Sequence, residues 1–382
     1  MDSIAGHKSS LTWIVHICTA ALVLLWLFPT VGLLVSSFRT GDQISTSGWW
    51  KSLTASEQNM TIRTAAPDAQ VQQGDVFVIE GQLFATGSGA DISAWGISSR
   101  AISDFAPGET AELRKGGTIT VQADGAYRMA HTEAFSGKRG QRVFVTAVTP
   151  PEFTTENYEN MLFDPANADG MMRAFVSTLT VTIPATVIPI VIAAFAAFAL
   201  AWMEFPGRAL LVAAVVGLLV VPLQLALIPL LQLHNAIGIG KGYLGVWMAH
   251  TGFGLPLAIY LLRNYMVGLP RDIIENARVD GATDFQIFTK IVLPLSFPAL
   301  ASFAIFQFLW TWNDLLVARV FLLDSTGSTT VMTVQITEML GTRGGNWEIL
   351  ATAAFVSIAV PLGVFFAMQK YLVRGLLAGS VK

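Results

Sequence analysis

The stretch Glu275-Asn276-Ala277-Arg278-Val279-Asp280-Gly281 interrupts a chain whose second half is otherwise largely apolar. Pro270 stands where the first turn of a helix tolerates proline, because the nitrogen there needs no partner, and Asp272 adds negative charge in that turn. Gly281 permits a sharp turn that a residue with a Cβ would resist. The stretch therefore predicts a short charged helix that runs through Ala277 and ends in a turn.

A second helix is expected directly after this turn. Thr283 and Gln286 have the Thr-x-x-Gln spacing of a capping box, which marks a helix start. The apolar residues that follow recur at helical spacing and form a stripe: Phe285, Phe288, Ile291 and Val292. We expect a rigid helix-turn-helix that lies at a membrane surface and can transmit movement.

Composition indicates a membrane protein that also has a water-soluble part. The chain is 53% hydrophobic and 13% charged, whereas soluble domains contain about 25% charged residues. A net charge of -3 argues against a nucleic-acid partner. The single cysteine, Cys18, excludes an internal disulfide, and the five histidines lack metal-ligand spacing, so no metal site is expected.

Six largely apolar runs are long enough to cross a bilayer, which takes about 20 residues. They cover residues 13–37, 173–203, 210–233, 244–262, 298–317 and 349–368. Nine basic residues near the span ends lie on the side of both termini and the 275–281 stretch, against three on the other side. Both termini are therefore expected in the cytoplasm.

The segment 39–172 between the first two runs differs in kind and must lie outside the cytoplasm. Residues 76–79, 118–121 and 142–148 read as strands, and Asp124-Gly125 is a good hairpin turn. Short strands at this spacing indicate a small β-sandwich or β-barrel. We predict three parts: residues 1–38 with the first span, the extracytoplasmic β-rich insertion 39–172, and a five-helix core with its tail, 173–382.

The 275–294 stretch resembles the EAA loop of ABC importer permeases, which contacts the ATPase subunit. That loop has Glu-Ala-Ala, three residues, Gly, nine residues and then Ile-x-Leu-Pro. The positions in register here are Glu275, Ala277, Gly281, Ile291, Leu293 and Pro294, while Asn276 replaces the first Ala. The resemblance implies that Glu275 and Asp280 supply charge near the interface and that Phe285 and Phe288 anchor the helix in an apolar ATPase groove. An ordinary amphipathic loop between two spans is the alternative.

Trp310-Thr311-Trp312-Asn313-Asp314 resembles the Trp-Asn-Glu/Asp signature of sugar-importing permeases. Polar groups such as Asn313 and Asp314 are costly in lipid, so they should face protein, a cavity or water. Two roles stay open: bracing of neighbouring helices, or lining of the sugar path, where the rings of Trp310 and Trp312 would stack on a sugar face.

The tail is similar to that of one membrane subunit of maltose-type importers, which reaches between the ATPase subunits. The resemblance implies an ATPase contact for Gly375, Gly379 and Ser380. The flanks of the insertion, 37–39 and 46–50 on one side and 151–158 on the other, are also similar to segments that are nearly continuous in carbohydrate ABC permeases. About a hundred residues, roughly 53–149, are inserted between them, and closing such a longer loop costs little extra entropy.

These features identify the chain as a member of the maltose-type carbohydrate ABC importer permeases, nearest to the alpha-glucoside permeases with a large periplasmic insertion. The resemblance implies an all-α polytopic membrane protein with six transmembrane helices and the type I importer fold, carrying an inserted β-rich domain, in the bacterial inner membrane. Its implied partners are a second homologous permease, two copies of an ABC ATPase, an extracytoplasmic sugar-binding protein and membrane lipid.

No catalysis and no cofactor are expected in this chain itself. The glycine-rich stretch 238–242 lacks the Ser or Thr that follows lysine in a phosphate-binding loop. The resemblance implies that the partner ATPase binds ATP and Mg and that the cargo is an alpha-glucoside such as maltose, trehalose or sucrose. The alternatives are an ion-coupled secondary transporter, although no internal repeat is evident, and a membrane-anchored extracellular sensor.

Overall fold

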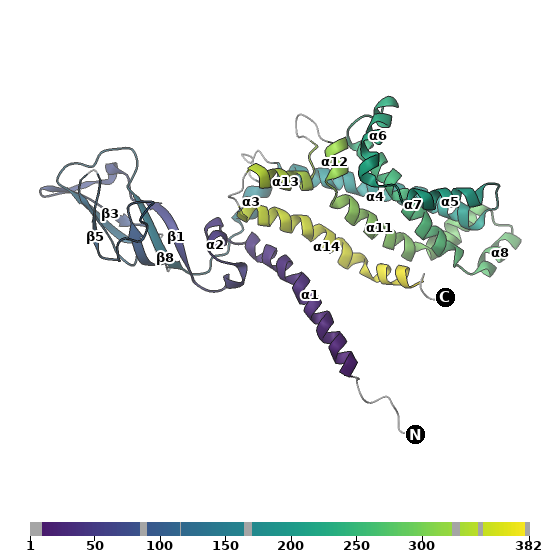
Figure 1. Cartoon of the computed structure of the whole chain (residues 1–382), viewed down its shortest axis with the longest axis horizontal. Coiled ribbons are helices and arrows are strands. Elements are labelled where there is room, and N and C mark those ends of the chain that lie inside the picture. Colours follow the sequence, from purple (N-terminus) through teal and green to yellow (C-terminus); the bar gives the residue numbers. More distant parts are fainter. Residues whose placement is uncertain are drawn as a thin grey trace, which may run out of the picture. The chain divides into compact units, whose positions relative to one another are not determined.

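A computed structural model describes residues 10–84, 90–114, 116–163, 170–322, 329–342 and 347–378. The chain divides into two compact units, Met1–Glu159 with Gly345–Thr352 and Asn160–Gly344 with Ala353–Lys382. The first unit holds one long helix and all the described strands, and the second holds most of the remaining helices (Figure 1). The predicted division into residues 1–38, 39–172 and 173–382 depends on which side of the membrane each part occupies. It therefore stays a prediction.

The first unit begins with α1 (Ser10–Ser37), whose apolar side chains are mostly exposed, as in a helix that faces lipid. Two short helices follow, α2 (Gly41–Thr46) and η1 (Trp49–Lys51). The helix α3 (Glu156–Leu162) returns to the end of α1, where Asn157 donates hydrogen bonds to the carbonyl oxygens of Ser37 and Arg39, both 2.9 Å away. The entry and exit of the inserted domain are therefore tied together.

The inserted domain is a sandwich of two antiparallel sheets. The first has the order β1 (Ser56–Arg63), β8 (Arg142–Thr149) and β4 (Asp91–Gly96). The second has the order β2 (Val71–Gln73), β3 (Val76–Gln82), β7 (Ala126–His131), β6 (Thr118–Val121) and β5 (Thr110–Glu112). A 3-10 turn, η2 (Pro67–Ala69), precedes β2.

The two sheets share one core, as expected from the alternation of apolar residues along their strands. Trp95 and Val143 from the first sheet and Ile119 from the second are completely buried in it. The three predicted strands correspond to β3, β6 and β8, and Gly125 has the positive φ, +85°, of the predicted hairpin turn. The prediction of a β-rich insertion is confirmed, and the sandwich rather than the barrel is observed.

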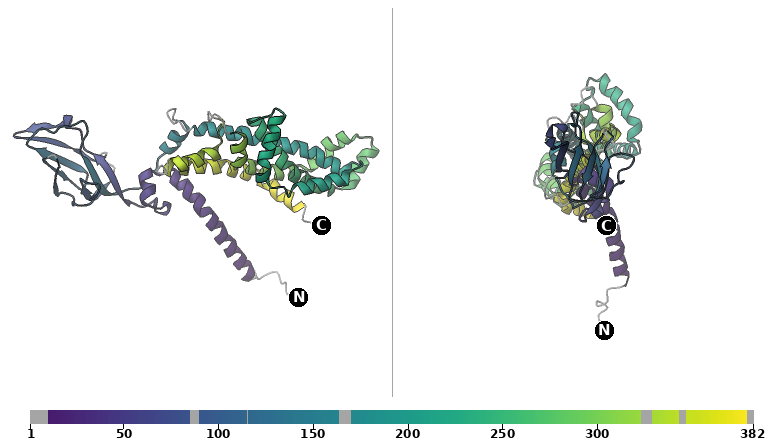
Figure 2. Two further views of the ribbon diagram at one scale, coloured as in Figure 1. Left: turned by 45° about the horizontal axis from the view of Figure 1, so that its top comes forward. Right: turned by 90° about the vertical axis from the view of Figure 1, so that its left-hand side faces the viewer.

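The second unit is helical, and its long helices pack side by side. Its elements are α4 (Met171–Trp202), α5 (Arg208–Leu218), α6 (Leu223–Ala236), α7 (Tyr243–Val267), α8 (Arg271–Val279), α9 (Asp284–Ile287), the π-helical turn η3 (Phe288–Val292), α10 (Leu293–Leu295), α11 (Phe297–Trp312), α12 (Leu316–Phe321), α13 (Met332–Thr342) and most of α14 (Trp347–Ala378). α4 lies along α7, and α11 packs against both (teal to green in Figure 2).

Four helices among the described residues are long and apolar enough to cross a membrane: residues 11–37, 171–202, 243–267 and 347–371. Each of the other two predicted runs belongs to a pair of helices that meet at a bend. α5 and α6 meet at 111°, because Pro222 has no amide hydrogen and disfavours helical backbone at the residue before it. The predicted span 298–317 ends at Trp312, and its beginning is bent by 70° from the segment Asp284–Leu295.

Candidate functional site

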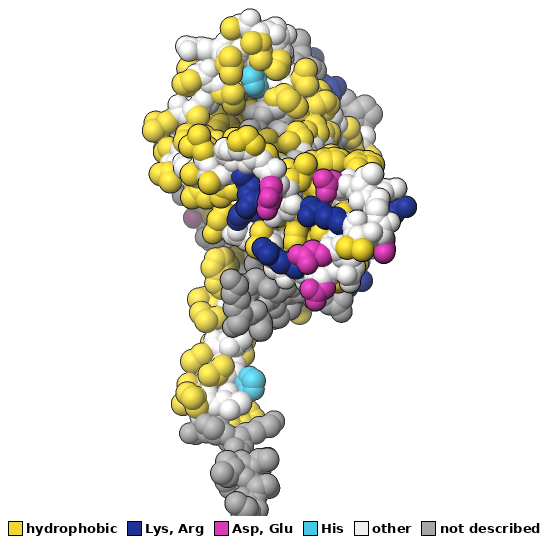
Figure 3. Space-filling model, turned by 90° about the vertical axis from the view of Figure 1, so that its right-hand side faces the viewer, with side chains coloured by type: hydrophobic (Ala, Val, Ile, Leu, Met, Phe, Trp, Pro, Cys, Tyr) yellow, Lys and Arg dark blue, Asp and Glu magenta, His cyan; other side chains and the backbone are white. Residues whose placement is uncertain are grey.

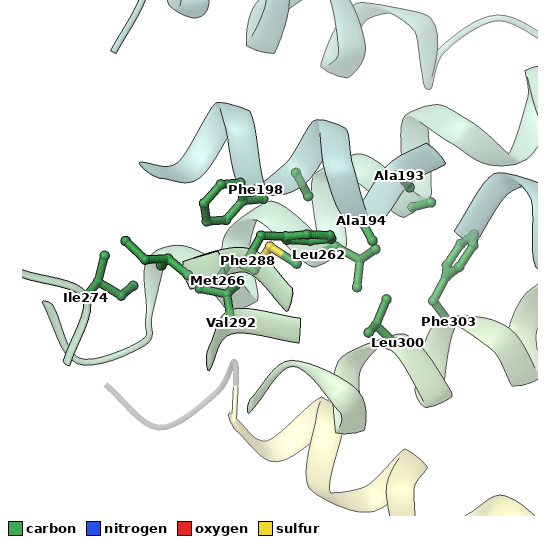
Figure 4. Close-up of a cluster of buried hydrophobic side chains, with 13 residues drawn as sticks. Ala193, Ala194, Phe198, Leu262, Met266, Ile274, Phe288, Val292, Leu300 and Phe303 are labelled. Carbon is green, nitrogen blue, oxygen red and sulfur yellow. The ribbon is translucent and has the colours of Figure 1, made fainter. Parts of the chain in front are cut away.

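The charged helix α8 has one fully buried side chain, which packs against the long helices. Ile274 is 1% exposed and belongs to one hydrophobic cluster with Leu262 and Met266 of α7. Figure 4 shows these side chains together with Phe198 of α4. Burying an isoleucine side chain contributes roughly 1.5–3 kcal/mol. α8 is thereby docked on the helical unit, while its other faces remain exposed.

α8 ends in a Schellman motif centred on Gly281, whose φ is +80°. The amide of Gly281 donates to the carbonyl oxygen of Arg278 at 3.0 Å, and that of Ala282 to Ala277, also at 3.0 Å. These two bonds satisfy carbonyl groups that a helix end leaves without partners. No heavy atom lies within 4 Å of a Cβ built on Gly281, so only backbone conformation demands glycine here.

The predicted capping box opens the next helix and is confirmed. The amide of Gln286 donates to Oγ1 of Thr283 at 3.3 Å, and the amide of Thr283 donates to Oε1 of Gln286 at 2.9 Å. Ala282 before the cap and Ile287 after it both join the hydrophobic cluster, which fixes the entry angle of the chain. α8 and α9 are thus joined by a turn with a defined geometry.

The Ile-x-Leu-Pro segment explains the shape of the chain after α9. Pro294 cannot donate a hydrogen bond and its ring would clash with the carbonyl of Lys290, four residues earlier. The backbone widens there into η3, where the amide of Leu293 bonds to the carbonyl oxygen of Phe288. The 70° bend into α11 follows at Ser296. Proline therefore separates the α8–α9 segment from the long helix that it leads into.

The structure corrects the expected role of Phe288. This side chain is only 3% exposed, and its ring lies 4.6 Å from Phe195 and 5.2 Å from Phe198, centroid to centroid. It cannot enter a groove of another subunit, because it already fills the core of this one (Figure 4). Phe285, one helical turn earlier, is 65% exposed and remains available to a partner.

We call the exposed face of residues 271–294 the coupling surface. It combines charged side chains with large apolar ones. Glu275, Asn276 and Asp280 are exposed, as are Gly281 and Pro294, while Ala277, Ile291 and Leu293 are half-buried. Ile273 and Val279 are 43% and 86% exposed; sequence reasoning missed both, although their apolar character beside Glu275 was a visible signal. Figure 3, which views the end of the molecule that carries α8, shows Lys, Arg, Asp and Glu side chains gathered among hydrophobic ones.

The Trp-Asn-Asp motif is split between buried and exposed side chains. Trp312 is 1% exposed, and its Nε1 donates to the carbonyl oxygen of Ser357 at 2.9 Å. Trp310 is 44% exposed, and the Asn313 side chain, also exposed, donates to the carbonyl oxygen of Leu309 at 2.8 Å. The contacts of Trp312 favour the bracing role for this residue over a place in the sugar path.

Asp314 lies just before the N-cap residue of α12, Leu315, and its carboxylate caps amides of the first turn. Its Oδ1 accepts from the amide of Val317 at 3.3 Å, and its Oδ2 accepts from the amide of Ala318 at 3.0 Å. Oδ2 also lies 3.8 Å from Nε2 of His250, and both side chains are less than a tenth exposed. The carboxylate thus has partners within the protein, which again favours bracing.

The predicted tail contact falls at the limit of the described chain. Gly375 lies in α14, which continues as a helix to Ala378, and Gly379 and Ser380 lie outside the described residues. The body of α14 is fixed near its end by Ser302, whose Oγ donates to the carbonyl oxygen of Tyr371 at 3.1 Å. The ATPase contact of the tail stays a prediction.

Comparison with known proteins identifies the class of protein. The family described as "Binding-protein-dependent transport system inner membrane component" matches residues 168–377, more than half of the chain. The chain belongs to this family and is a membrane permease subunit of an ABC transporter. The matched region begins just before α4 and contains the coupling surface and the Trp-Asn-Asp motif.

Three individual relatives show which transport permeases the chain resembles. The chain is 60% identical to the alpha-glucoside transport system permease protein AglG of Rhizobium meliloti, over 99% of both chains. It is 56% identical to the osmoprotective compounds uptake permease protein GgtD of Synechocystis sp., over 60% of this chain and 76% of that one. It is 33% identical to the trehalose transport system permease protein SugB of Mycobacterium tuberculosis, over 61% of this chain and 84% of that one.

Proposed function

We propose that this chain is one of two membrane subunits of an ATP-driven importer whose cargo is an alpha-glucoside such as maltose, trehalose or sucrose. The observation that carries the proposal is the coupling surface, where exposed Phe285 and Val279 stand beside Glu275 and Asp280 on a segment with fixed geometry. The similarity to permeases named for alpha-glucosides and for trehalose supports the cargo.

The proposed topology has six spans with both termini and the coupling surface in the cytoplasm. Four straight helices and two bent pairs support the count when each bent pair is taken as one span. The excess of Lys and Arg on the proposed cytoplasmic side supports the orientation. In this topology the β-rich domain lies in the periplasm.

The proposed mechanism passes movement from two ATPase subunits, which hold ATP and Mg, to the spans. Ile274 and Phe288 carry the contact inward, because they share one buried cluster with Leu262 of α7 and Phe303 of α11. A dense core transmits displacement instead of absorbing it. Closure of the ATPases on ATP would thus turn a cavity shared with the second permease from inward-facing to outward-facing, where a sugar-binding protein delivers the cargo.

Transport in proteoliposomes tests this proposal. The chain would be reconstituted with its co-purified permease and ATPase, with ATP inside the vesicles and a sugar-binding protein outside, and uptake of labelled maltose, trehalose and sucrose measured. We expect uptake that requires ATP. Phe285→Ala should reduce it about tenfold, as for a truncated anchor at an interface. Val71→Ala is the matched control, because Val71 is 60% exposed on β2, far from the coupling surface in sequence.

Two results would contradict the proposal. Uptake that persists without ATP but collapses when an ionophore removes the ion gradient would identify an ion-coupled transporter. Sugar binding by the whole chain with no uptake under any condition would identify a sensor. Uptake of another class of solute would leave the ATP-driven mechanism in place and overturn only the cargo.

A further inference from the structure

A cavity of about 390 Å³ in the β-rich domain is lined by an unusual number of arginines. Arg63 comes from the end of β1, Arg114 from the segment between β5 and β6, and Arg139 and Arg142 from the chain that enters β8. One acidic residue, Glu133, lines the same cavity. We call this cavity the arginine pocket and infer that it binds a small organic anion that carries phosphate or carboxylate groups.

The arginine pocket has an excess of positive charge, with four arginines against the single carboxylate of Glu133. None of its four arginines forms an ion pair with any carboxylate in the described part of the chain. Arg128, elsewhere in the same domain, pairs with Glu80 at 3.3 Å. Unpaired arginines that gather from separate segments indicate a site for an anion that is brought in from outside.

Two of these arginines occupy positions that disfavour the folded state. Arg63 and Arg142 are direct partners in the antiparallel register of β1 and β8. Like charges directly opposite each other on neighbouring strands repel and lower stability. A bound anion would remove this repulsion, so its binding would stabilise the domain.

The wall of the arginine pocket is held in place before any ligand arrives. Gln70 brackets Phe135 by donating to its carbonyl oxygen at 3.3 Å and accepting from its amide at 2.8 Å. The amide of Gln141 donates to Oγ1 of Thr64 at 2.9 Å. Nη1 of Arg63 donates to the carbonyl oxygen of Gly140 at 3.1 Å. A site that is preorganised in this way loses less entropy on binding.

His131 also lines the arginine pocket and adds a donor. Nδ1 of His131 accepts a hydrogen bond from the amide of Glu133 at 2.6 Å, which leaves Nε2 as the nitrogen that donates. That nitrogen faces Gly116, which also lines the pocket and has φ of +88°. Buried Ile79 and Met129 supply an apolar part of the lining.

These features define the ligand by chemistry and size. The planar guanidinium group binds phosphate and carboxylate through paired hydrogen bonds. A volume of 390 Å³ lies at the lower end of the range for small-molecule sites, about 300–1,000 Å³. A phosphorylated or carboxylated metabolite fits this description, and so does the headgroup of an anionic lipid.

Binding of inorganic pyrophosphate to the full-length chain tests the inference. The protein would be held in phosphatidylcholine nanodiscs and titrated by calorimetry at low salt. We expect saturable binding that Arg139→Gln and Arg114→Gln each weaken about tenfold, since one charge-assisted contact is lost. Both side chains are exposed, so the fold should survive, and thermal melting would verify this. Arg128→Gln is the matched control, and it should leave binding unchanged.

Further binding measurements identify the source of the anion and test the inference. If an anionic lipid headgroup occupies the pocket, it should compete with pyrophosphate. The wild type would then bind pyrophosphate more weakly in phosphatidylglycerol nanodiscs than in phosphatidylcholine nanodiscs, whereas Arg139→Gln would show no such difference. Equal binding in both lipids would identify a soluble anion. Absence of saturable binding at about 1 mM pyrophosphate, or equal losses in Arg128→Gln and Arg139→Gln, would overturn the inference.

Discussion

The guanidinium group of Arg278 donates a hydrogen bond to the carbonyl oxygen of Trp202, 3.0 Å away. Trp202 is the last residue of α4, where helix carbonyls lack internal partners and the helix dipole is negative. The same guanidinium lies 3.3 Å from Asp284 at the start of α9. Arg278 therefore ties α8 to both α9 and the end of α4.

We expect Arg278→Gln to loosen this tie and to reduce sugar uptake per ATP hydrolysed, with a stability loss of about 1 kcal/mol because the site is half exposed. Arg278→Lys keeps the charge and should recover part of the coupling. The ratio of uptake to ATPase activity in proteoliposomes measures this. An unchanged ratio in Arg278→Gln would show that the contact to Trp202 does not transmit movement.

Gly281 should tolerate a side chain in space but not in backbone conformation. Gly281→Val places a β-branched residue at φ of +80°, where left-handed backbone costs about 1–2 kcal/mol. We expect ATP hydrolysis that no longer drives uptake, while the spans remain inserted. Gly217→Ala is the control, since Gly217 lies in α5, has no neighbour within 4 Å of a built Cβ and has no positive φ. Normal uptake by an inserted Gly281→Val protein would refute the role of the turn.

Phe288 and Phe285 should have different roles: Phe288 should stabilise the fold, and Phe285 should dock a partner subunit. Phe288→Ala leaves a cavity in the core, and we expect a loss of about 3–5 kcal/mol in unfolding free energy, measured by thermal melting in detergent. Phe285→Ala removes a side chain that is 65% exposed, so melting should change little while ATPase-coupled uptake falls. The reverse pattern would mean that Phe285 is the structural residue.

Asp314 should act through its acceptor oxygens and not through its charge. Asn keeps one of the two acceptor oxygens, so we expect Asp314→Asn to keep sugar uptake and to lose less stability than Asp314→Ala, which should cost about 1–2 kcal/mol by leaving the amides of both Val317 and Ala318 without a partner. Melting and uptake would be measured together. A loss of uptake in Asp314→Asn at unchanged melting temperature would return this residue to the sugar path.

Local features of this protein were predictable because neighbouring residues create them. The capping box of Thr283 and Gln286 and the turn at Gly281 depend on residues within one or two turns of each other, so spacing alone reveals them. Long apolar runs and alternating strands are equally local, which is why the membrane character and the β-rich insertion were both visible in the sequence.

Tertiary structure decided which members of each pattern face inward. Phe285 and Phe288 belong to one apolar stripe, yet only Phe288 meets Phe195 and Phe198, because the packing of η3 against α4 buries one edge of that stripe. Asp314 became a cap because the chain leaves the helix at Trp312.

The arginine pocket also depends on tertiary packing rather than on local sequence. Arg63, Arg114 and Arg142 are far apart along the chain, and each alone is an ordinary exposed residue. The pairing of β1 with β8 and the closure of the sandwich bring them around one cavity. Sequence by itself determined the long apolar helices, three of the strands and the membrane class, because these follow from near neighbours. Only long-range packing determined the surfaces, because they are made of residues that meet after the chain has folded.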